Sequence, residues 1–226
     1  MAKFIGSAAG RFLGKFANGV GFNWKGVVYA REYLDGSRIT NPRTAKQQLQ
    51  RAKFGLAGSM SGVFKNFYYL LGMDKAATEQ HSTPEAIFVK QNLQNISGST
   101  PSDLEVNYTE LTLTPNNQKL AAIMPGELDL ETPLTIKTSI EESNYDQRFN
   151  TQLDTVYLVG YSKTGKEAVI SDGNAKRNTG SVEVTVPGYW QGHYVEAWVF
   201  VRGNETNPLT RGKVSPTIYV GNGRIL

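Results

Sequence analysis

The chain contains no cysteine among its 226 residues. This absence excludes disulfide bridges, thiolate zinc sites and cysteine nucleophiles. It leaves the compartment open, because a protein without thiols works in either redox environment. Long apolar runs are also missing, and none approaches the roughly 18 residues of a membrane span. The N-terminus lacks a continuous apolar segment, so we expect no cleaved signal peptide.

Histidine is almost as scarce, because His81 and His193 are the only two. A serine hydrolase needs a single histidine, so this count alone does not exclude one. However, the sequence has no G-x-S-x-G nucleophile elbow. His81 precedes a predicted helix start and His193 precedes a predicted strand, which favours exposed loop positions for both.

The residues that are present suffice for a folded core with an uneven charge. Hydrophobic residues make up 39% of the chain and aromatic residues 11%, so global disorder is not expected. The net charge of +4 combines +8 over residues 1–100 with −4 over residues 101–226. A basic front half suits nucleic-acid binding. The opposite charges of the two halves equally suit head-to-tail protein assembly.

Residues 1–40 form a first zone that is rich in glycine and aromatic residues. Its first sixteen residues place apolar side chains at helical spacing, which allows a helix on a membrane surface. Three glycines would each cost that helix about 1 kcal/mol, which favours a flexible or extended arm that orders against a neighbour. Beyond the arm, alternation and a glycine turn predict a hairpin with strands at 19–24 and 27–33. We expect Phe22, Trp24 and Gly26 to shape this hairpin and its packing.

Residues 41–98 form a second, helical zone. Thr44 and Gln47 have the spacing of a capping box, which predicts a helix start. Apolar residues then recur every three or four positions and predict one helix of about six turns that ends near Gly72. A second helix is predicted from Ser82-Thr83-Pro84-Glu85 to about Asn95.

Residues 99–226 form a third zone that follows a Ser/Gly-rich linker and is predicted to be all-β. Seven or eight strands in this length predict a sandwich of the immunoglobulin or fibronectin type III kind, with Trp198 or Trp190 as its buried aromatic. The predicted fold class is therefore α+β. The candidate strands are 103–113, 119–124, 133–140, 154–161, 166–171, 181–187, 194–202 and 214–220, with turns that include Pro115-Asn116-Asn117 and Pro125-Gly126.

Two stretches approach known site motifs. Residues 160–167 nearly match the phosphate-binding pattern GxxxxGK[ST], but Glu167 stands where a magnesium-binding hydroxyl is needed. A hairpin turn at 163–165 is the better interpretation. Residues 126–131, GELDLE, alternate carboxylates with leucines. This pattern allows calcium binding or acid–base chemistry but favours a strand with one wet face. We therefore predict no catalytic, cofactor or metal site.

The stretch NPRTAKQQLQRAKF, residues 41–54, has four basic residues and no acidic one. Cations near a helix N-terminus are mildly unfavourable, so an acidic group in the fold or on a partner is expected. The candidate contact residues, for assembly or for a polyanion, are Arg43, Lys46, Gln50, Arg51 and Lys53.

Three stretches resemble an uncharacterised domain-of-unknown-function family of Bacteroidetes and their phages. They read GVGFNWKGVVYARE, NPRTAKQQLQRAKF, and YVEAWVFVRG followed by VSPTIYVG. The resemblance spans most of the chain, is weakest over 120–180 and brings no catalytic motif. Its phage members, with crAss-like and other tailed phages as sources, imply a structural role in the virion. The most specific residues are Trp24, Gly26, Asn41, Pro42, Arg43, Thr44, Gln47, Gln50, Arg51 and Phe54.

These observations favour a non-enzymatic structural protein of a tailed bacteriophage, in the head–tail region, the tail or the capsid. It would be made in the host cytoplasm and reside in the virion, with other copies and other virion proteins as partners. No membrane span, cofactor or small-molecule substrate is expected. One alternative is a nucleic-acid-binding accessory protein that uses Arg43, Lys46, Arg51 and Lys53. Another is a host-encoded protein-interaction module.

Overall fold

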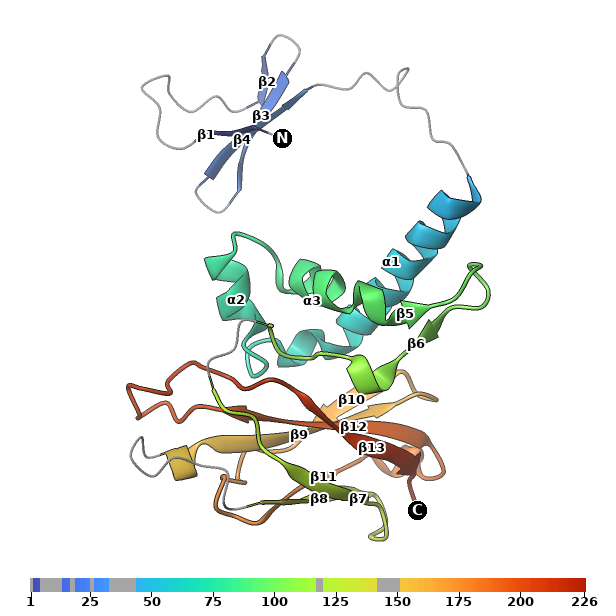
Figure 1. Cartoon of the computed structure of the whole chain (residues 1–226), viewed down its shortest axis with the longest axis vertical. Helices are drawn as coiled ribbons and strands as arrows, with labels where there is room; N and C mark the ends of the chain where they lie inside the picture. The colour runs from blue at the N-terminus through green and yellow to red at the C-terminus, as the bar shows by residue number, and fades with distance from the viewer. Residues whose placement is uncertain are drawn as a thin grey trace. The chain divides into compact units, whose positions relative to one another are not determined.

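The computed structural model describes residues 2–4, 14–16, 19–24, 27–32, 44–116, 120–141 and 151–226 (Figure 1). The chain divides into two compact units, Met1–Gln47 and Gln48–Leu226. None of the helices that the structure describes has the length and apolar character needed to cross a bilayer.

The first unit contains a four-stranded antiparallel sheet in the order β1-β4-β3-β2. The predicted hairpin is confirmed, because β3 (Gly19–Trp24) pairs with β4 (Val27–Glu32). Phe22 lies opposite Tyr29 in this register, and their rings stack with centroids 5.6 Å apart. Trp24 ends β3, and Gly26 lies outside the described residues.

Both edges of this sheet come from the N-terminal arm, as β1 (Ala2–Phe4) and β2 (Gly14–Phe16). These six residues are strands that pair within the chain, so the helix that the apolar spacing allowed is wrong for them. Glycine favours this outcome, because it weakens a helix and offers no side chain to pack on one.

The first predicted helix begins where the sequence placed it but ends early. α1 (Ala45–Phe64) follows Thr44, whose Oγ1 accepts the Gln47 backbone N–H at 3.3 Å. The helix stops eight residues before Gly72 and continues only as a 3₁₀ turn, η2 (Lys65–Phe67). Beyond the end of α1, the Tyr68 hydroxyl donates to the Ser61 carbonyl at 2.8 Å and holds the chain in the turn.

A helix that the sequence did not predict follows this turn. Gly72, with φ +73°, reverses the chain, and α2 (Met73–Glu79) begins immediately after it. The second predicted helix is confirmed as α3 (Pro84–Asn92) with a 3₁₀ extension, η3 (Leu93–Asn95). Its cap is Thr83, whose Oγ1 accepts the Ala86 N–H at 3.1 Å.

The second unit also holds two antiparallel sheets that pack together. The central sheet has the order β10 (Glu167–Ile170), β9 (Thr155–Ser162), β12 (Tyr194–Arg202), β13 (Ile218–Arg224). The outer sheet has the order β11 (Ser181–Thr185), β8 (Thr135–Ile140), β7 (Pro125–Asp129). A short hairpin of β5 (Ile96–Ser97) and β6 (Glu105–Val106) stands apart from them.

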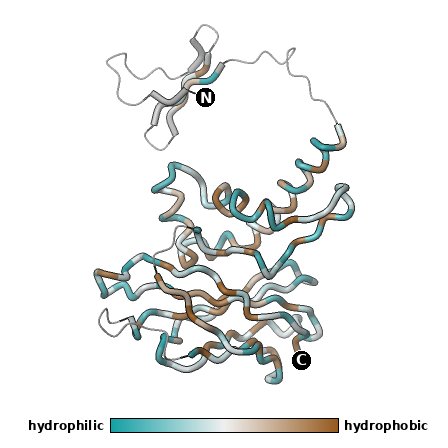
Figure 2. The backbone as a smooth tube through the Cα atoms, viewed as in Figure 1, coloured by the Kyte–Doolittle hydropathy of each residue, from teal (hydrophilic) through white to brown (hydrophobic). Residues whose placement is uncertain are grey.

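The central sheet is buried on both faces. Trp198 and Phe200 of β12 point into a core shared with the helices, whereas Val199 and Val201 point into a core shared with the outer sheet. Figure 1 shows the helices on one face of the central sheet and the outer sheet on the other, and the apolar segments of Figure 2 concentrate between these layers. The α+β prediction is therefore confirmed, and Trp198 and Trp190 are both fully buried.

Three predicted strands differ from the structure. The segment 103–113 forms only β6 and a 3₁₀ turn, η4 (Tyr108–Glu110). The backbone at the end of this segment bonds to a side chain and not to a neighbouring strand: Thr217 Oγ1 accepts the N–H groups of Leu113 and Thr114. Residues 120–124 are not a strand, although Leu120 and Ile123 are buried. The last strand lies at 218–224, four residues later than predicted, and Pro125-Gly126 begins β7 in place of a turn.

Candidate assembly surfaces

The first turns of α1 are exposed, and they carry the predicted contact residues. Buried residues of α1 appear only from Ala57 onward. Lys46, Gln50 and Arg51 are exposed, and Phe54, on the same part of the helix, is 49% exposed. The first turn of α1 holds no acidic residue, so the helix dipole leaves the N-terminal end of α1 electropositive. We call Lys46, Gln50, Arg51 and Lys53 the basic helix start; Arg43 lies outside the described residues.

Lys53 of the basic helix start has a partner within the fold. Lys53 Nζ donates a 2.8 Å hydrogen bond to the Ile96 carbonyl at the start of β5. This bond ties α1 to the β5–β6 hairpin, so Lys53 serves the fold as well as the surface charge.

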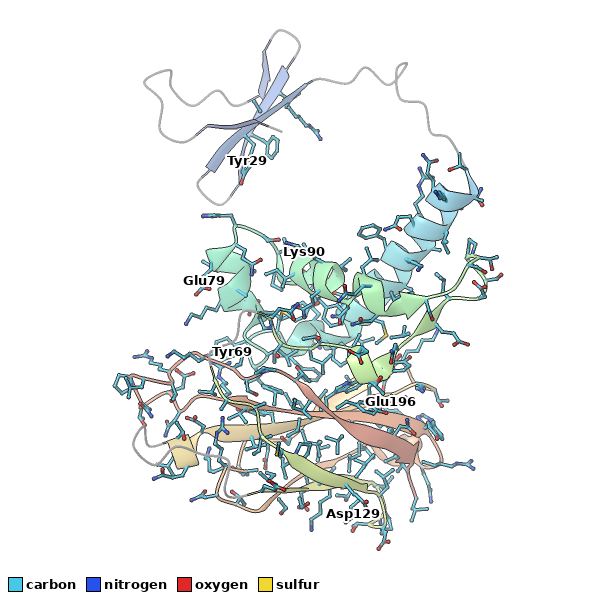
Figure 3. All side chains as sticks on the ribbon, viewed as in Figure 1. Tyr29, Tyr69, Glu79, Lys90, Asp129 and Glu196 are labelled. Atoms are coloured by element: carbon cyan, nitrogen blue, oxygen red, sulfur yellow. The ribbon has the colours of Figure 1, made fainter. Side chains whose placement is uncertain are left out.

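The outer sheet presents an acidic surface to solvent. Glu183 of β11 and Asp129 of β7 both lie opposite Lys137 of β8 in the strand register. Glu127 and Glu131 are exposed beside them, whereas Leu128 and Leu130 pack into the core. The prediction of a strand with one wet face is confirmed here. We call Glu127, Asp129, Glu131 and Glu183 the acidic face; Asp129 is labelled in Figure 3.

Gln50, Arg51 and Lys53 of the basic helix start belong to a different layer of the second unit than the acidic face does. From residue 48 onward, α1 is part of the helical layer and rises away from the central sheet, while the outer sheet covers the opposite face of that sheet (Figure 1). The helix that carries Arg51 and the strand that carries Glu183 therefore lie on opposite sides of the central sheet. Such opposed charges can complement each other between two copies that stack in the same direction.

The near-match to a phosphate-binding loop is a hairpin turn, as predicted. β9 and β10 pair directly, and the Gly165 N–H donates to Ser162 Oγ at 2.9 Å across the turn. His193 is half-buried, not exposed, and its Nδ1 lies 2.9 Å from the same Oγ. A serine–histidine pair of this kind resembles an activated nucleophile, but Ser162 is completely buried and its Oγ already accepts the Gly165 N–H. His81 is exposed, as predicted.

A cluster that the sequence reasoning missed surrounds Glu196 on the helical face of β12. The carboxylate is almost completely buried, forms an ion pair with Lys163 and accepts the Tyr219 hydroxyl at 2.5 Å. The Lys163 ammonium also lies 4.5 Å from the centroid of the Tyr108 ring and 5.6 Å from that of Tyr194. Burial and the hydrogen bond to Glu196 raise the pKa of Tyr219 to about 12.

This cluster neutralises a buried charge. Cation, hydroxyl and carboxylate satisfy one another, and two aromatic rings cover the ammonium. A signal in the sequence could have found it, because Glu196 is the one acid inside the apolar run YVEAWVF. No group of three or more His, Asp or Glu side chains that could hold a metal occurs in the part of the chain that the structure describes.

The comparison with protein families decides the family. The family of unknown function DUF6266 matches residues 11–221, which include the hairpin, the helices and both sheets. The chain belongs to DUF6266. The resemblance expected from the sequence is confirmed at this level, and the DUF6266 description names neither a phage nor a host. No curated protein matches this DUF6266 chain.

Proposed function

We propose that this protein is a non-enzymatic structural subunit whose copies assemble head to tail, the basic helix start of one copy binding the acidic face of the next. The observation that carries the proposal is that α1, which holds Arg51, and β11, which holds Glu183, lie on opposite sides of the central sheet. A contact between two different surfaces repeats from copy to copy and builds a ring or a filament. We propose a second copy of this chain as the binding partner, because the chain carries both the basic and the acidic surface itself.

The contact also has an apolar component. Phe54 is a large exposed side chain beside Arg51, and burial of such a ring at the centre of an interface contributes more than the surrounding charges. The charges would set direction and encounter rate, and Phe54 would supply affinity. The finer form of the proposal is a subunit of a tailed-phage particle, in the head–tail region, the tail or the capsid.

Charge reversal tests the contact. Sedimentation velocity at low salt should show oligomers that dissociate as ionic strength rises, because the Debye length falls from about 30 Å at 0.01 M to about 8 Å at 0.15 M. Arg51→Glu and Glu183→Lys should each abolish oligomers, and a mixture of the two single variants should associate again, since the acidic face of the first complements the basic helix start of the second. Lys90→Glu makes the same charge change as Arg51→Glu at an exposed position of α3 and serves as the control.

Three outcomes separate the alternatives. A protein that stays monomeric at every concentration and salt contradicts the head-to-tail contact. Absence from purified particles of its source, measured by mass spectrometry, contradicts the virion role. Binding to DNA or RNA that weakens steeply with salt and is lost in Arg51→Glu, without self-association, identifies a nucleic-acid accessory protein.

A further inference from the structure

An open hollow of about 560 Å³ lies between the α2 region and the loop that follows β12. Its walls come from residues 69–78 and 202–212, more than 120 residues apart in the chain. Gly72 and Gly212 both adopt left-handed φ values, +73° and +64°, and bend the two walls around it. This volume is in the range of small-molecule sites in proteins.

The floor of the hollow is fixed by Arg202. Its guanidinium donates to the Tyr69 carbonyl at 2.5 Å and to Glu205 Oε1 at 2.9 Å, and it is almost completely buried. These bonds join the two walls and satisfy the charge of Arg202 with that of Glu205. A site held in this way needs little reorganisation to bind a ligand.

Tyr69 supplies a flat aromatic platform. Arg202 Cζ lies 4.4 Å from the centroid of its ring and covers one face. The side chain is still 64% exposed, so the other face is open to solvent. Figure 3 places Tyr69 beside the junction of the helices and the central sheet. The cation that covers one face of the Tyr69 ring holds its exposed face ready for a flat ligand.

Hydrogen-bond donors and hydrogen-bond acceptors both surround the Tyr69 ring. Lys75 and Arg211 are donors only, and Asp74 is an acceptor. Lys75 Nζ donates to the Gly212 carbonyl at 3.3 Å, which uses one of its three protons. Arg211 is 70% exposed, and its Nε lies 3.6 Å from Glu205, which leaves its Nη groups as further donors.

We infer that this hollow binds a carbohydrate through one pyranose ring. A sugar has an apolar C–H face that can stack on Tyr69, and hydroxyls that both donate and accept hydrogen bonds. Asp74 would accept from hydroxyls, and Lys75 and Arg211 would donate to them. A phosphate or sulfate fits less well, because it would face the carboxylates of Asp74 and Glu205 and would leave the aromatic platform unused.

The test is an NMR titration of the full-length ¹⁵N-labelled chain with four probes: methyl glucoside, methyl galactoside, a chitin oligosaccharide and inorganic phosphate. High salt keeps copies of the protein apart, so the result is independent of the proposed assembly. Saturable shifts of the Lys75 and Gly212 amides with at least one sugar, at a Kd of about 0.1–10 mM, are expected. Tighter binding of the oligosaccharide than of both glycosides would indicate that the natural ligand is a glycan chain.

Matched variants locate the site. Tyr69→Ala should raise the Kd for the sugar at least about tenfold. Tyr69→Phe keeps the ring, so its Kd should differ from that of the wild type by less than about threefold. Arg211→Ala alters an exposed donor and should weaken binding without loss of fold. Tyr189→Ala removes an equally exposed tyrosine elsewhere and should change nothing. Shifts with phosphate alone, shifts outside the hollow, or no shift with any probe would each overturn the inference.

Discussion

The Tyr219 hydroxyl donates a 2.5 Å hydrogen bond to the carboxylate of Glu196, and both residues stand on neighbouring strands of the central sheet. Glu196 is only 1% exposed, and its other oxygen pairs with Lys163 of the β9–β10 turn. A buried carboxylate is tolerated only with such partners, since an isolated one would cost far more than the fold can supply.

Replacement of Lys163 by methionine should destabilise the protein. The change leaves Glu196 buried with Tyr219 as its donor and no counter-charge. Loss of a partner from a fully buried pair costs about 3–5 kcal/mol, and because the Lys163 side chain is 38% exposed we expect about 1–3 kcal/mol. Urea denaturation measures this difference. Lys166→Met, an exposed change in the same turn, should alter the free energy of unfolding by less than about 0.5 kcal/mol. Equal effects of the two variants would contradict the role of the Lys163–Glu196 pair.

Alkaline pH should weaken the fold through Tyr219. Its pKa is raised from 10.0 to about 12 in the folded protein, so the unfolded chain loses this proton first as pH rises. The free energy of unfolding should therefore be unaffected below pH 10 and fall between pH 10 and about 12. Urea denaturation across this range, in wild type and Tyr219→Phe, measures the slope. The variant should be less stable at neutral pH and show a shallower alkaline decline; an identical decline would refute the contribution of Tyr219.

Gly58 and Gly203 should respond oppositely to alanine. A Cβ on Gly58 of α1 would meet no atom within 4 Å, so Gly58→Ala should stabilise the protein by about 1 kcal/mol. A Cβ on Gly203 would lie 1.9 Å from the Thr210 carbonyl oxygen, so Gly203→Ala should destabilise it by about 3 kcal/mol or prevent folding. Thermal melting distinguishes the two. A Gly58→Ala protein that is more stable but assembles less would show that the glycine admits a neighbouring copy.

Replacement of Asp154 should strongly destabilise the protein, because this buried side chain holds the loop that follows β12. Its Oδ1 accepts the Asn204 N–H at 2.9 Å and the Thr210 hydroxyl at 3.0 Å, and its Oδ2 lies 3.8 Å from Nε of the buried Arg177. Burial lowers the pKa of Arg177, and the charge of Asp154 opposes that shift. Asp154→Ala removes the counter-charge and should cost about 3–5 kcal/mol.

The control for this prediction is Asp172→Ala. Asp172 is exposed and bonds only locally, to Asn174 among the described contacts. Its loss should change the free energy of unfolding by less than about 1 kcal/mol. Comparable destabilisation by both variants, measured by denaturant titration, would contradict the anchoring role of Asp154.

Local signals in the sequence predicted local structure well. Thr44 and Thr83 cap their helices as their spacing indicated, and the turn at 163–165 joins two paired strands. β12 covers the predicted range, 194–202, because its alternating valines fit a strand with an inner face. The same run also contains Trp198 and Phe200 on the other face. That near-continuous apolar character indicates burial on both faces, which an open sandwich does not provide.

The candidate site residues were predicted only in part. The basic character of residues 46–53 was evident, but the internal bond of Lys53 to Ile96 was not, since its partner lies 43 residues away. Glu196 and Lys163, and likewise Tyr69 and Arg202, come together only across distant segments. No periodicity reports such pairs, because they depend on which face of the central sheet the helices cover.

The sequence by itself determined the caps, the hairpins and the alternating strands, since these depend on residues within a few positions of one another. The tertiary structure alone decided where α1 stops, that residues 113–114 bond to Thr217, and that the helices lie opposite the outer sheet. Burial and hydrogen-bond satisfaction act over the whole unit, so they override local preference wherever a distant partner binds the backbone more completely than a regular element would.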